Sequence, residues 1–196
     1  MSDPETLAVY GAQADAYATL EKADGPDADL TAFIAALPEG GRVLDLGCGT
    51  GSAAGHMAAV GLRVEAWDAT PEMVARAAAR DGVTVRLARF EDLSAQGLYD
   101  GIWANFSLLH APRDALPGHL SAIRAALRPG GLFHIGMKTG EGTARDALGR
   151  LYTFVTVEEL AALLTAAGMT PMTRRTGRGP GLAGTSDPFV IMQAHA

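Results

Sequence analysis

Glycine stands at every second position from Gly47 to Gly51, directly after an apolar run, and an acidic residue lies on either side of this turn in the sequence. Glycine adopts backbone angles that other residues avoid, and it lets a ligand lie against bare backbone. Asp45 stands just before the glycines, and Asp68 follows Gly47 by about 20 residues, a spacing at which an acid can bind the hydroxyls of a ribose. The pattern therefore predicts a site for a nucleotide-like ligand.

Two classes of ligand fit such a turn, and Asp45 distinguishes between them. The segment from Gly49 to Ala54 matches the G-x-G-x-x-G/A pattern of dinucleotide-binding turns, which is a weak signal on its own. A carboxylate two residues before the glycines would repel a pyrophosphate, whereas it suits a cationic group such as an ammonium or a sulfonium. A ligand with a ribose and a cationic end is therefore favoured.

These residues must be positioned by an alternation of strands and helices, which is typical of βαβ units and a mainly parallel sheet. We expect strands at 42–48, 63–69, 84–90, 99–107, 132–138, 172–176 and 189–195. We expect helices at 4–20, 27–37, 52–60, 71–80, 116–127 and 157–167. The predicted fold class is α/β: a doubly wound, mainly parallel seven-stranded sheet with an antiparallel last strand and an N-terminal helical lid.

The whole chain is expected to form a single domain, 1–196, in three parts. These are a helical lid at 1–38, a cofactor-binding core at 39–139, and a substrate-side loop, helix and C-terminal strand pair at 140–196. Ligands of open α/β sheets bind at the carboxyl ends of the strands, so the glycine turn is the expected place.

Composition narrows the possible partners. The net charge is −6 and there is no run of Lys or Arg, which disfavours a nucleic acid partner. Cys48 is the only cysteine, and no set of His, Asp and Glu shows metal-ligand spacing, so we expect no metal site. Neither a signal peptide nor an apolar run of membrane-spanning length is visible. We expect a cytoplasmic protein, a monomer or homodimer, that acts on a small molecule and has no membrane partner.

The motifs together resemble those of class I S-adenosylmethionine-dependent methyltransferases of the small-molecule branch, over essentially the whole chain. VLDLGCGTG (43–51) resembles their first motif, EAWDAT (65–70) the second and LARFEDL (87–93) the third. YDGIWANFSLLH (99–110) resembles the fourth strand and the loop that faces the methyl group, and LRPGGLFHI (127–135) the turn and fifth strand. YGAQADAYA (10–18) resembles the tyrosine-containing lid. The resemblance implies transfer of a methyl group from S-adenosylmethionine to a small molecule by in-line displacement, with S-adenosylhomocysteine as product and no metal.

The resemblance also implies how the methyl donor is held. Asp68 would bind the ribose, with Ala69 and Phe90 beside the adenine, and Asn105 would lie near the amino acid portion or the methyl group. Relatives often carry an acid on the third strand where this chain has Arg89, which cannot accept a hydrogen bond. Backbone around Phe90, or the side chain of Glu91 or Asp92, is expected to replace it. The predicted donor-binding residues are Tyr10, Tyr17, Asp45, Gly47, Cys48, Gly49, Gly51, Ser52, Asp68, Ala69, Met73, Phe90, Glu91 and Asn105.

Catalytic residues are harder to predict because a sulfonium methyl is already activated. His110 is the best candidate for a general base, since an unperturbed histidine titrates near neutrality; capping its loop or packing against the donor is the alternative. Asn105 is followed by Phe-Ser-Leu, which lacks the Pro-Pro-aromatic sequence of amino-methylating relatives. That departure disfavours methylation of a base amine or a glutamine amide. Lys138 and Tyr152 are further catalytic candidates.

The mixed-charge segment 137–154 follows the fifth strand on the substrate side. It is interpreted either as a binding loop for an anionic or zwitterionic acceptor or as a solvated surface loop. The predicted acceptor-binding residues are His110, Lys138, Arg145, Arg150 and Tyr152.

Two other functions remain open. One is an NAD(P)-dependent reductase, against which Asp45 and the LRPGG turn argue. The other is a cofactor-binding regulatory domain without catalysis, which the motifs fit equally well. RNA methylation is disfavoured by the negative charge.

Overall fold

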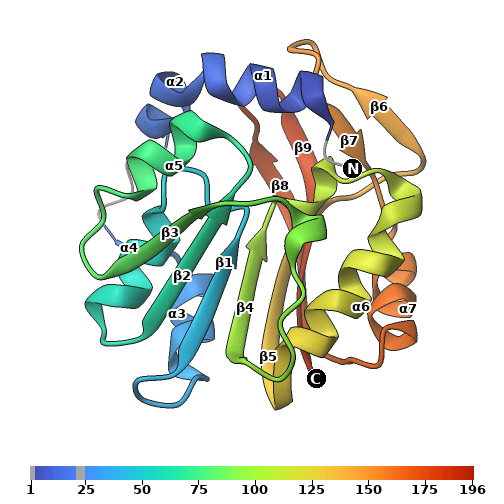
Figure 1. The fold of residues 1–196 in the computed structure, drawn as a ribbon. Helices are drawn as coiled ribbons and strands as arrows, with labels where there is room; N and C mark the ends of the chain where they lie inside the picture. Colours follow the sequence, from blue (N-terminus) through green and yellow to red (C-terminus); the bar gives the residue numbers. More distant parts are fainter. Residues whose placement is uncertain (1–2, 21–24) are drawn as a thin grey trace.

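The computed structural model describes residues 3–20 and 25–196 and contains a seven-stranded sheet with helices on both faces (Figure 1). The strand order is β3-β2-β1-β4-β5-β9-β8, and β9 is antiparallel to both of its neighbours. The strands are β1 (Arg42–Leu46), β2 (Arg63–Asp68), β3 (Val83–Leu87), β4 (Tyr99–Asn105), β5 (Leu127–Lys138), β8 (Thr170–Pro180) and β9 (Ser186–His195). The α/β class, the mainly parallel sheet and its antiparallel strand are thereby confirmed.

The helices form two layers and a cap. They are α1 (Pro4–Ala12), α2 (Ala14–Leu20), α3 (Ala28–Ala35), α4 (Ser52–Ala59), α5 (Pro71–Ala77), α6 (Leu116–Ala126) and α7 (Val157–Ala166). One buried cluster joins α3 and α4 to one face of the sheet through residues such as Phe33 and Met57, and the other joins α6 and α7 to the opposite face through Ile123 and Leu160. Figure 1 shows α1 and α2 lying across the end of the sheet to which the parallel strands point. Their role as a lid remains a prediction.

One predicted helix and one predicted strand in the N-terminal half differ from the structure. The single helix expected at 4–20 is two helices, because the chain leaves helical geometry at Gln13, whose φ is −106° and ψ 9°. The strand expected at 84–90 ends at Leu87, and the short 3₁₀ helix η1 (Phe90–Asp92) follows it. Phe90 therefore projects from a turn and not from the sheet.

The C-terminal strands are longer than predicted. β5 begins at Leu127, which pairs with Tyr99, and the Pro-Gly-Gly sequence forms an irregularity after which Leu132 pairs with Gly101. β8 and β9 pair from Thr170 to Pro180, so most of the Gly/Pro-rich segment 177–188, which separates the two predicted strands, belongs to one antiparallel ladder. Proline is tolerated there because β8 is an edge strand.

The segment 137–154 contains a hairpin that was expected as a loop. Strand β6 (Thr143–Arg145) pairs antiparallel with β7 (Leu151–Thr153) beside the end of β5. The turn between them carries Asp146 and Arg150. The hairpin therefore holds Asp146 and Arg150 in defined positions, which an irregular loop would not do.

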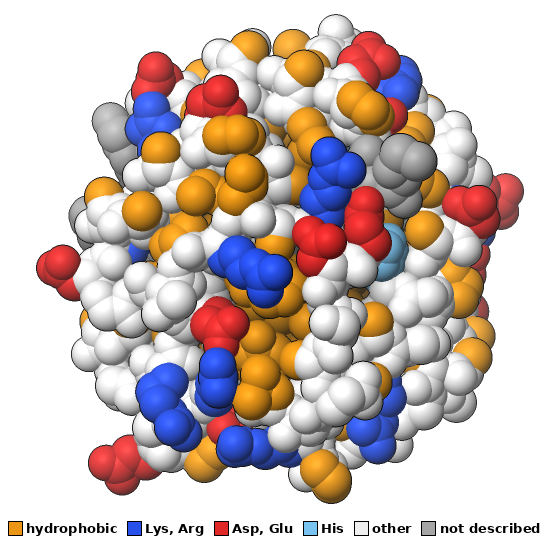
Figure 2. Space-filling model, in the orientation of Figure 1, with side chains coloured by type: hydrophobic (Ala, Val, Ile, Leu, Met, Phe, Trp, Pro, Cys, Tyr) orange, Lys and Arg blue, Asp and Glu red, His pale blue; other side chains and the backbone are white. Residues whose placement is uncertain are grey.

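Figure 2 shows hydrophobic side chains near the middle of one face, with charged side chains around them. Leu87 of β3 is 56% exposed. Within the described ranges, no helix has both the length and the apolar character needed to cross a membrane.

Candidate active site

The glycine turn is built for close approach of backbone. Gly47 and Gly49 have φ of 81° and 54°, in the left-handed region. A Cβ added to Gly47 would lie 2.3 Å from the Cβ of Ser107, so no other residue fits without displacement. The N–H groups of Gly47 and Cys48 both donate to the carbonyl of Trp67, at 2.8 and 2.9 Å. The turn is therefore held against the end of β2.

Asp68 completes this arrangement at the end of β2. Its carboxylate accepts hydrogen bonds from the backbone N–H groups of Gly49 and Thr70, both at 2.9 Å. Burial raises the pKa of Asp68, and the hydrogen bonds from Thr70 and Gly49 counteract part of that rise. The half-buried carboxylate also lines the cavity beside the turn.

A cavity of about 720 Å³, counting its open mouth, lies between the glycine turn, the end of β2, η1 and helix α1. Ligand sites commonly have volumes of roughly 300–1,000 Å³. The structure brings ten of the predicted residues to its wall: Tyr10, Tyr17, Gly47, Gly49, Asp68, Ala69, Met73, Phe90, Asn105 and His110. The first cavity, as we call it, thus gathers most of the predicted donor-binding set.

Other predicted donor-binding residues do not line this cavity. Asp45 is buried within β1, and Cys48 is packed in the core beside α4. Gly51 begins α4, where an added Cβ would lie 2.9 Å from Ala77 of α5, so its role is helix packing. Ser52 lines a surface hollow with α4 and α5, and Glu91 is exposed on η1.

The wall opposite the glycine turn is formed where β3 ends. Ala88, Arg89 and Phe90 line the first cavity there, whereas Asp92 does not. The Asp92 carboxylate accepts from the N–H of Arg89 at 2.8 Å. This wall offers backbone groups and an aromatic ring. Of the alternatives to the missing acid, backbone near Phe90 is therefore the one that the cavity exposes.

A second cavity, of about 940 Å³ with its mouth, lies between β4, β7 and the β8–β9 hairpin. It contains three of the predicted acceptor residues besides His110, namely Lys138, Arg150 and Tyr152. Its aromatic wall residues are Tyr10, Tyr17, Phe106, Tyr152 and Phe189. The two cavities share Tyr10, Tyr17, Asn105, Phe106 and His110. They therefore meet at the end of β4.

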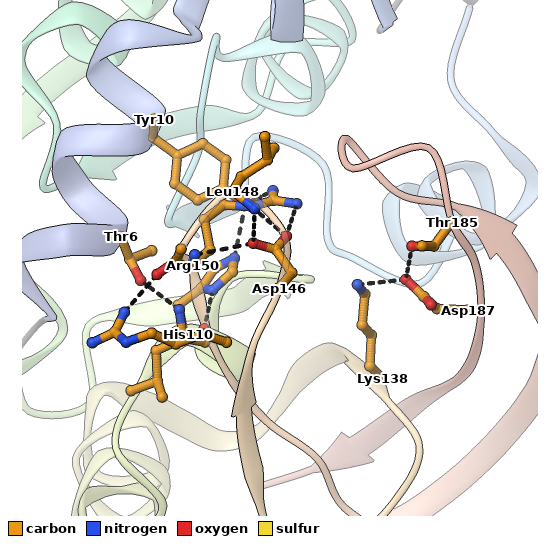
Figure 3. A network of polar contacts seen from close by, with 12 residues as sticks. Thr6, Tyr10, His110, Lys138, Asp146, Leu148, Arg150, Thr185 and Asp187 are labelled. Carbon is orange, nitrogen blue, oxygen red and sulfur yellow. Dashed lines mark hydrogen bonds and ion pairs between the residues drawn. The ribbon is translucent and has the colours of Figure 1, made fainter.

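His110 stands at this junction with both ring nitrogens engaged (Figure 3). Its Nδ1 lies 2.6 Å from the carbonyl oxygen of Leu151, and its Nε2 lies 2.8 Å from the hydroxyl of Tyr10. A carbonyl only accepts, so Nδ1 carries the proton and Nε2 presents its lone pair to Tyr10. Burial lowers the pKa of His110 from 6.5 to about 4, so the ring is neutral near pH 7.

Two cations lie beside His110. Arg150, only 2% exposed, pairs with Asp146 at 2.6 Å and donates from Nη1 to the Tyr10 hydroxyl at 2.9 Å. Lys138 pairs with Asp187 at 2.6 Å, and its Nζ lies 3.8 Å from the centre of the Tyr152 ring. Burial raises the pKa of Tyr152, so its hydroxyl stays protonated.

Arg145 lies outside both cavities. It is exposed on β6, where it pairs with Asp3 at 2.8 Å and with Glu5 at 3.2 Å. Its contacts tie the hairpin to the start of α1. The structure therefore places Arg145 apart from the other predicted acceptor residues.

Asn105 is held by a side chain of the neighbouring strand β5. The Nε2 of His134 lies 3.2 Å from its Oδ1, and the His134 ring stacks on Trp103 with centroids 3.5 Å apart. Burial lowers the pKa of His134 to about 3, so this neutral ring donates to the amide from Nε2. The Asn105 side chain is thereby oriented at the wall that both cavities share.

Phe106 is a site residue that the sequence motifs did not single out. Its φ of 54° is the only positive value of a non-glycine residue in the described ranges. Such backbone is costly for an aromatic residue and often marks a functional position. An added Cβ at Gly136 of β5 would lie 2.5 Å from Asn105 Oδ1, so this glycine leaves room for the turn. Nothing in the local sequence marks this backbone conformation.

No cluster of three or more His, Cys, Asp or Glu side chains suited to a metal ion occurs in the described parts of the chain. The site instead offers a carboxylate, backbone amides, aromatic rings and a neutral histidine.

Comparisons with known proteins agree with this arrangement. A methyltransferase domain family matches residues 43–131. A ubiquinone biosynthesis O-methyltransferase of Xanthomonas axonopodis pv. citri is 32% identical over 178 residues, which covers 75% of this chain and 74% of that protein. One from Cereibacter sphaeroides is 31% identical over 180 residues, covering 81% and 71%.

A solved structure has the same fold and a related sequence. It is the 1,6-didemethyltoxoflavin-N1-methyltransferase of Burkholderia thailandensis, with bound 1,6-didemethyltoxoflavin and S-adenosylhomocysteine. It matches with a TM-score of 0.71 and 29% identity over 100% of this chain and 91% of its own. By sequence and by fold, the chain belongs to the class I S-adenosylmethionine-dependent methyltransferases.

Proposed function

We propose that this enzyme transfers a methyl group from S-adenosylmethionine in the first cavity to a hydroxyl of a small aromatic molecule in the second. The observation that carries the proposal is the wall shared by the two cavities, which contains Asn105, Phe106 and His110. A methyl donor and an acceptor bound on either side would meet there. Proximity and alignment account for much of the catalysis of such a transfer.

The first cavity fits the chemistry of the donor. Asp68 offers a carboxylate to the ribose hydroxyls, and the rings and backbone near Ala69 and Phe90 offer a surface for adenine. The turn at Gly47 and Gly49 would hold the amino acid portion. Asp45, buried in β1 just before the turn, would support this position of the turn. When bound, S-adenosylmethionine supplies an electrophilic methyl group on a sulfonium. Helix α1 would close this cavity as a lid.

An aromatic acceptor is favoured by the walls of the second cavity. Phe106, Tyr152 and Phe189 present ring faces and edges, which attract flat ring systems. Lys138 and Arg150 add positive charge beside the rings. The relatives named above are called O-methyltransferases or carry a bound ring compound, which supports the same class of acceptor. His110 would receive the proton of the acceptor.

The first step of the test is binding, measured by calorimetry and thermal shift. S-adenosylhomocysteine at 100 times its Kd should stabilise the protein by roughly 2.7 kcal/mol. Stabilisation by NADH without any by S-adenosylhomocysteine would support the reductase and contradict the proposal.

The second step is turnover, measured as S-adenosylhomocysteine formed from S-adenosylmethionine in the presence of phenols, catechols and ring nitrogen compounds. Methylation of a hydroxyl compound supports the proposal, and mass spectrometry identifies the methylated atom. Binding of the donor without turnover on any acceptor would indicate the regulatory alternative. Methylation of ring nitrogens alone would contradict the choice of oxygen.

A further inference from the structure

Arg150 is a buried charged side chain, and binding of a donor and an acceptor does not by itself explain why it is buried. It is among the largest fully buried side chains of the described residues, 2% exposed, although it carries a permanent charge. Asp146 binds it through both Nε and Nη2, at 3.0 and 2.6 Å. Its Nη1 then points at the hydroxyl of Tyr10, 2.9 Å away (Figure 3). A buried guanidinium held this firmly is a directed hydrogen-bond donor.

The hydrogen-bonding capacity of Arg150, Tyr10 and His110 determines which of them donates in each contact. Arginine has no acceptor, so the Tyr10 oxygen accepts from Arg150 and its own proton must point elsewhere. The available partner is Nε2 of His110, 2.8 Å away. That nitrogen is unprotonated, because Nδ1 donates to the carbonyl of Leu151 at 2.6 Å. The hydrogen bonds therefore run from Arg150 to Tyr10 and from Tyr10 to His110.

The Tyr10 hydroxyl also stands where the two ligands would meet. Tyr10 lines both cavities, and so does His110. With one lone pair of its oxygen bound by Arg150, the other remains available to a hydroxyl from the second cavity. An acceptor hydroxyl that reaches Tyr10 would find its proton route to His110 already formed.

We propose that Tyr10 and His110 form a proton relay for the acceptor hydroxyl, and that Arg150 is the positioning residue that directs it. The inference rests on the proposed function. The acceptor oxygen bonds to the methyl carbon as the carbon–sulfur bond breaks, and that bond's electron pair stays on sulfur. The acceptor proton passes to the Tyr10 oxygen while the Tyr10 proton passes to His110 Nε2. The products are the methyl ether, S-adenosylhomocysteine and a protonated His110, which later releases its proton to water.

The charges around His110 suit a transient role as proton acceptor. Arg150 and Lys138 oppose the positive charge on His110, and Asp146 favours it, whereas burial has the largest effect and keeps the resting ring neutral. Arg150 also opposes the rise in the Tyr10 pKa that burial causes. The groups that face His110 are Tyr10 from α1, Lys138 from β5, and Asp146, Arg150 and Tyr152 from the β6–β7 hairpin and the turn within it.

The test compares two acceptors that differ in acidity. Catechol keeps its proton near neutral pH, whereas 4-nitrocatechol is largely ionised and needs no proton acceptor. Removing the relay by Tyr10→Phe should lower kcat with catechol by about 100-fold, the usual order for general base catalysis. The loss with 4-nitrocatechol should be smaller by at least about tenfold. His110→Gln should show the same selective loss, and Arg150→Met should follow it wherever that variant folds.

The matched control is Tyr99→Phe. Tyr99 donates to Glu65 at 3.0 Å and lines neither cavity, so its loss should not change the ratio of the two rates. Equal losses on both catechols in Tyr10→Phe would overturn the relay and leave Tyr10 as a structural contact of α1.

A second measurement does not need turnover. Nitrogen-15 NMR of the complex with S-adenosylhomocysteine should show His110 as the neutral Nδ1–H tautomer, with an Nε2 shift that moves in Tyr10→Phe and not in Tyr99→Phe. A proton on Nε2 would overturn the relay. If the parent binds S-adenosylhomocysteine but methylates neither catechol, the relay is refuted; if it does not bind S-adenosylhomocysteine, the proposed function itself fails.

Discussion

The carboxylate of Asp68 accepts a hydrogen bond from the backbone N–H of Gly49 at 2.9 Å, so the end of β2 and the turn after β1 are joined directly. The second oxygen of the same carboxylate accepts from Thr70. One side chain therefore both shapes the turn and faces the cavity.

Asp68→Ala should weaken binding of S-adenosylhomocysteine roughly 10–100-fold, because hydrogen bonds to a charged group contribute about 1.5–3 kcal/mol. Calorimetry measures the change directly. Glu158→Gln on α7, an exposed acid that lines neither cavity, serves as the control and should bind like the parent. Unchanged affinity in Asp68→Ala would remove Asp68 from the site.

Gly47→Ala should be much more harmful than Gly61→Ala. Both glycines have left-handed backbone, with φ of 81° and 88°, which costs an alanine roughly 1–2 kcal/mol. The added methyl would meet nothing within 4 Å at Gly61, but it would lie 2.3 Å from Ser107 at Gly47. We expect a further loss of about 1–3 kcal/mol at Gly47. Urea unfolding of both variants measures the difference. Equal losses of stability would show that the turn and Ser107 can move apart at no cost in free energy.

Acid should destabilise the protein through His110. Its pKa is 6.5 in an unfolded chain and about 4 in the folded one, so the unfolded state binds the proton first as the pH falls. The free energy of unfolding does not change with the protonation of His110 above pH 6.5, and it falls between pH 6.5 and 4. At pH 5 it is lower by about 2 kcal/mol. His110→Gln should flatten this part of the pH dependence of unfolding by that amount.

The control for acid unfolding is Ser121→Ala on α6, an exposed residue without a titratable group, which should keep the pH dependence of the parent. A slope that is unchanged in His110→Gln would mean that the folded protein binds a proton at His110 as readily as the unfolded chain does.

Arg145 and Arg150 lie five positions apart and should respond very differently to replacement by methionine. Arg145 is an exposed partner of Asp3 and Glu5, and exposed pairs contribute little to stability. Arg150 is buried with Asp146, and removal of one partner of a buried pair costs about 3–5 kcal/mol. Denaturant unfolding compares the two variants. The KM of an identified acceptor should also be unchanged in Arg145→Met, since a changed KM would return Arg145 to the acceptor site.

Local sequence signals predicted most of the residues that meet at the first cavity. The glycine turn and Asp68 belong to one βαβ unit, where strand order and chain direction bring their ends together. Spacing along the chain was therefore a good measure of distance in space. The same holds for the helix cap at Thr156, whose hydroxyl accepts from the N–H of Glu159, only three residues further along the chain.

The residues of the second cavity are brought together by contacts that spacing along the chain does not reveal. Arg145 and Arg150 have the same chemistry in the sequence, and only the β6–β7 hairpin turns one outward and buries the other. Tyr10 and His110 are 100 residues apart, and nothing local to either predicts their contact. The left-handed backbone of Phe106 is equally hidden, because it follows from the packing of β4 beside Gly136.

Helix α1 has a thermodynamic consequence for how tightly the two proposed ligands bind. It contributes Tyr10 to both cavities, and Thr6 ties it to the hairpin by accepting from the N–H of Leu151 at 2.9 Å. A donor in the first cavity and an acceptor in the second would both lie against Tyr10, so we expect their affinities to be coupled. Coupling is reciprocal: the factor by which the donor tightens the acceptor equals the factor by which the acceptor tightens the donor. Positive cooperativity between the two ligands is thus expected from a single shared helix.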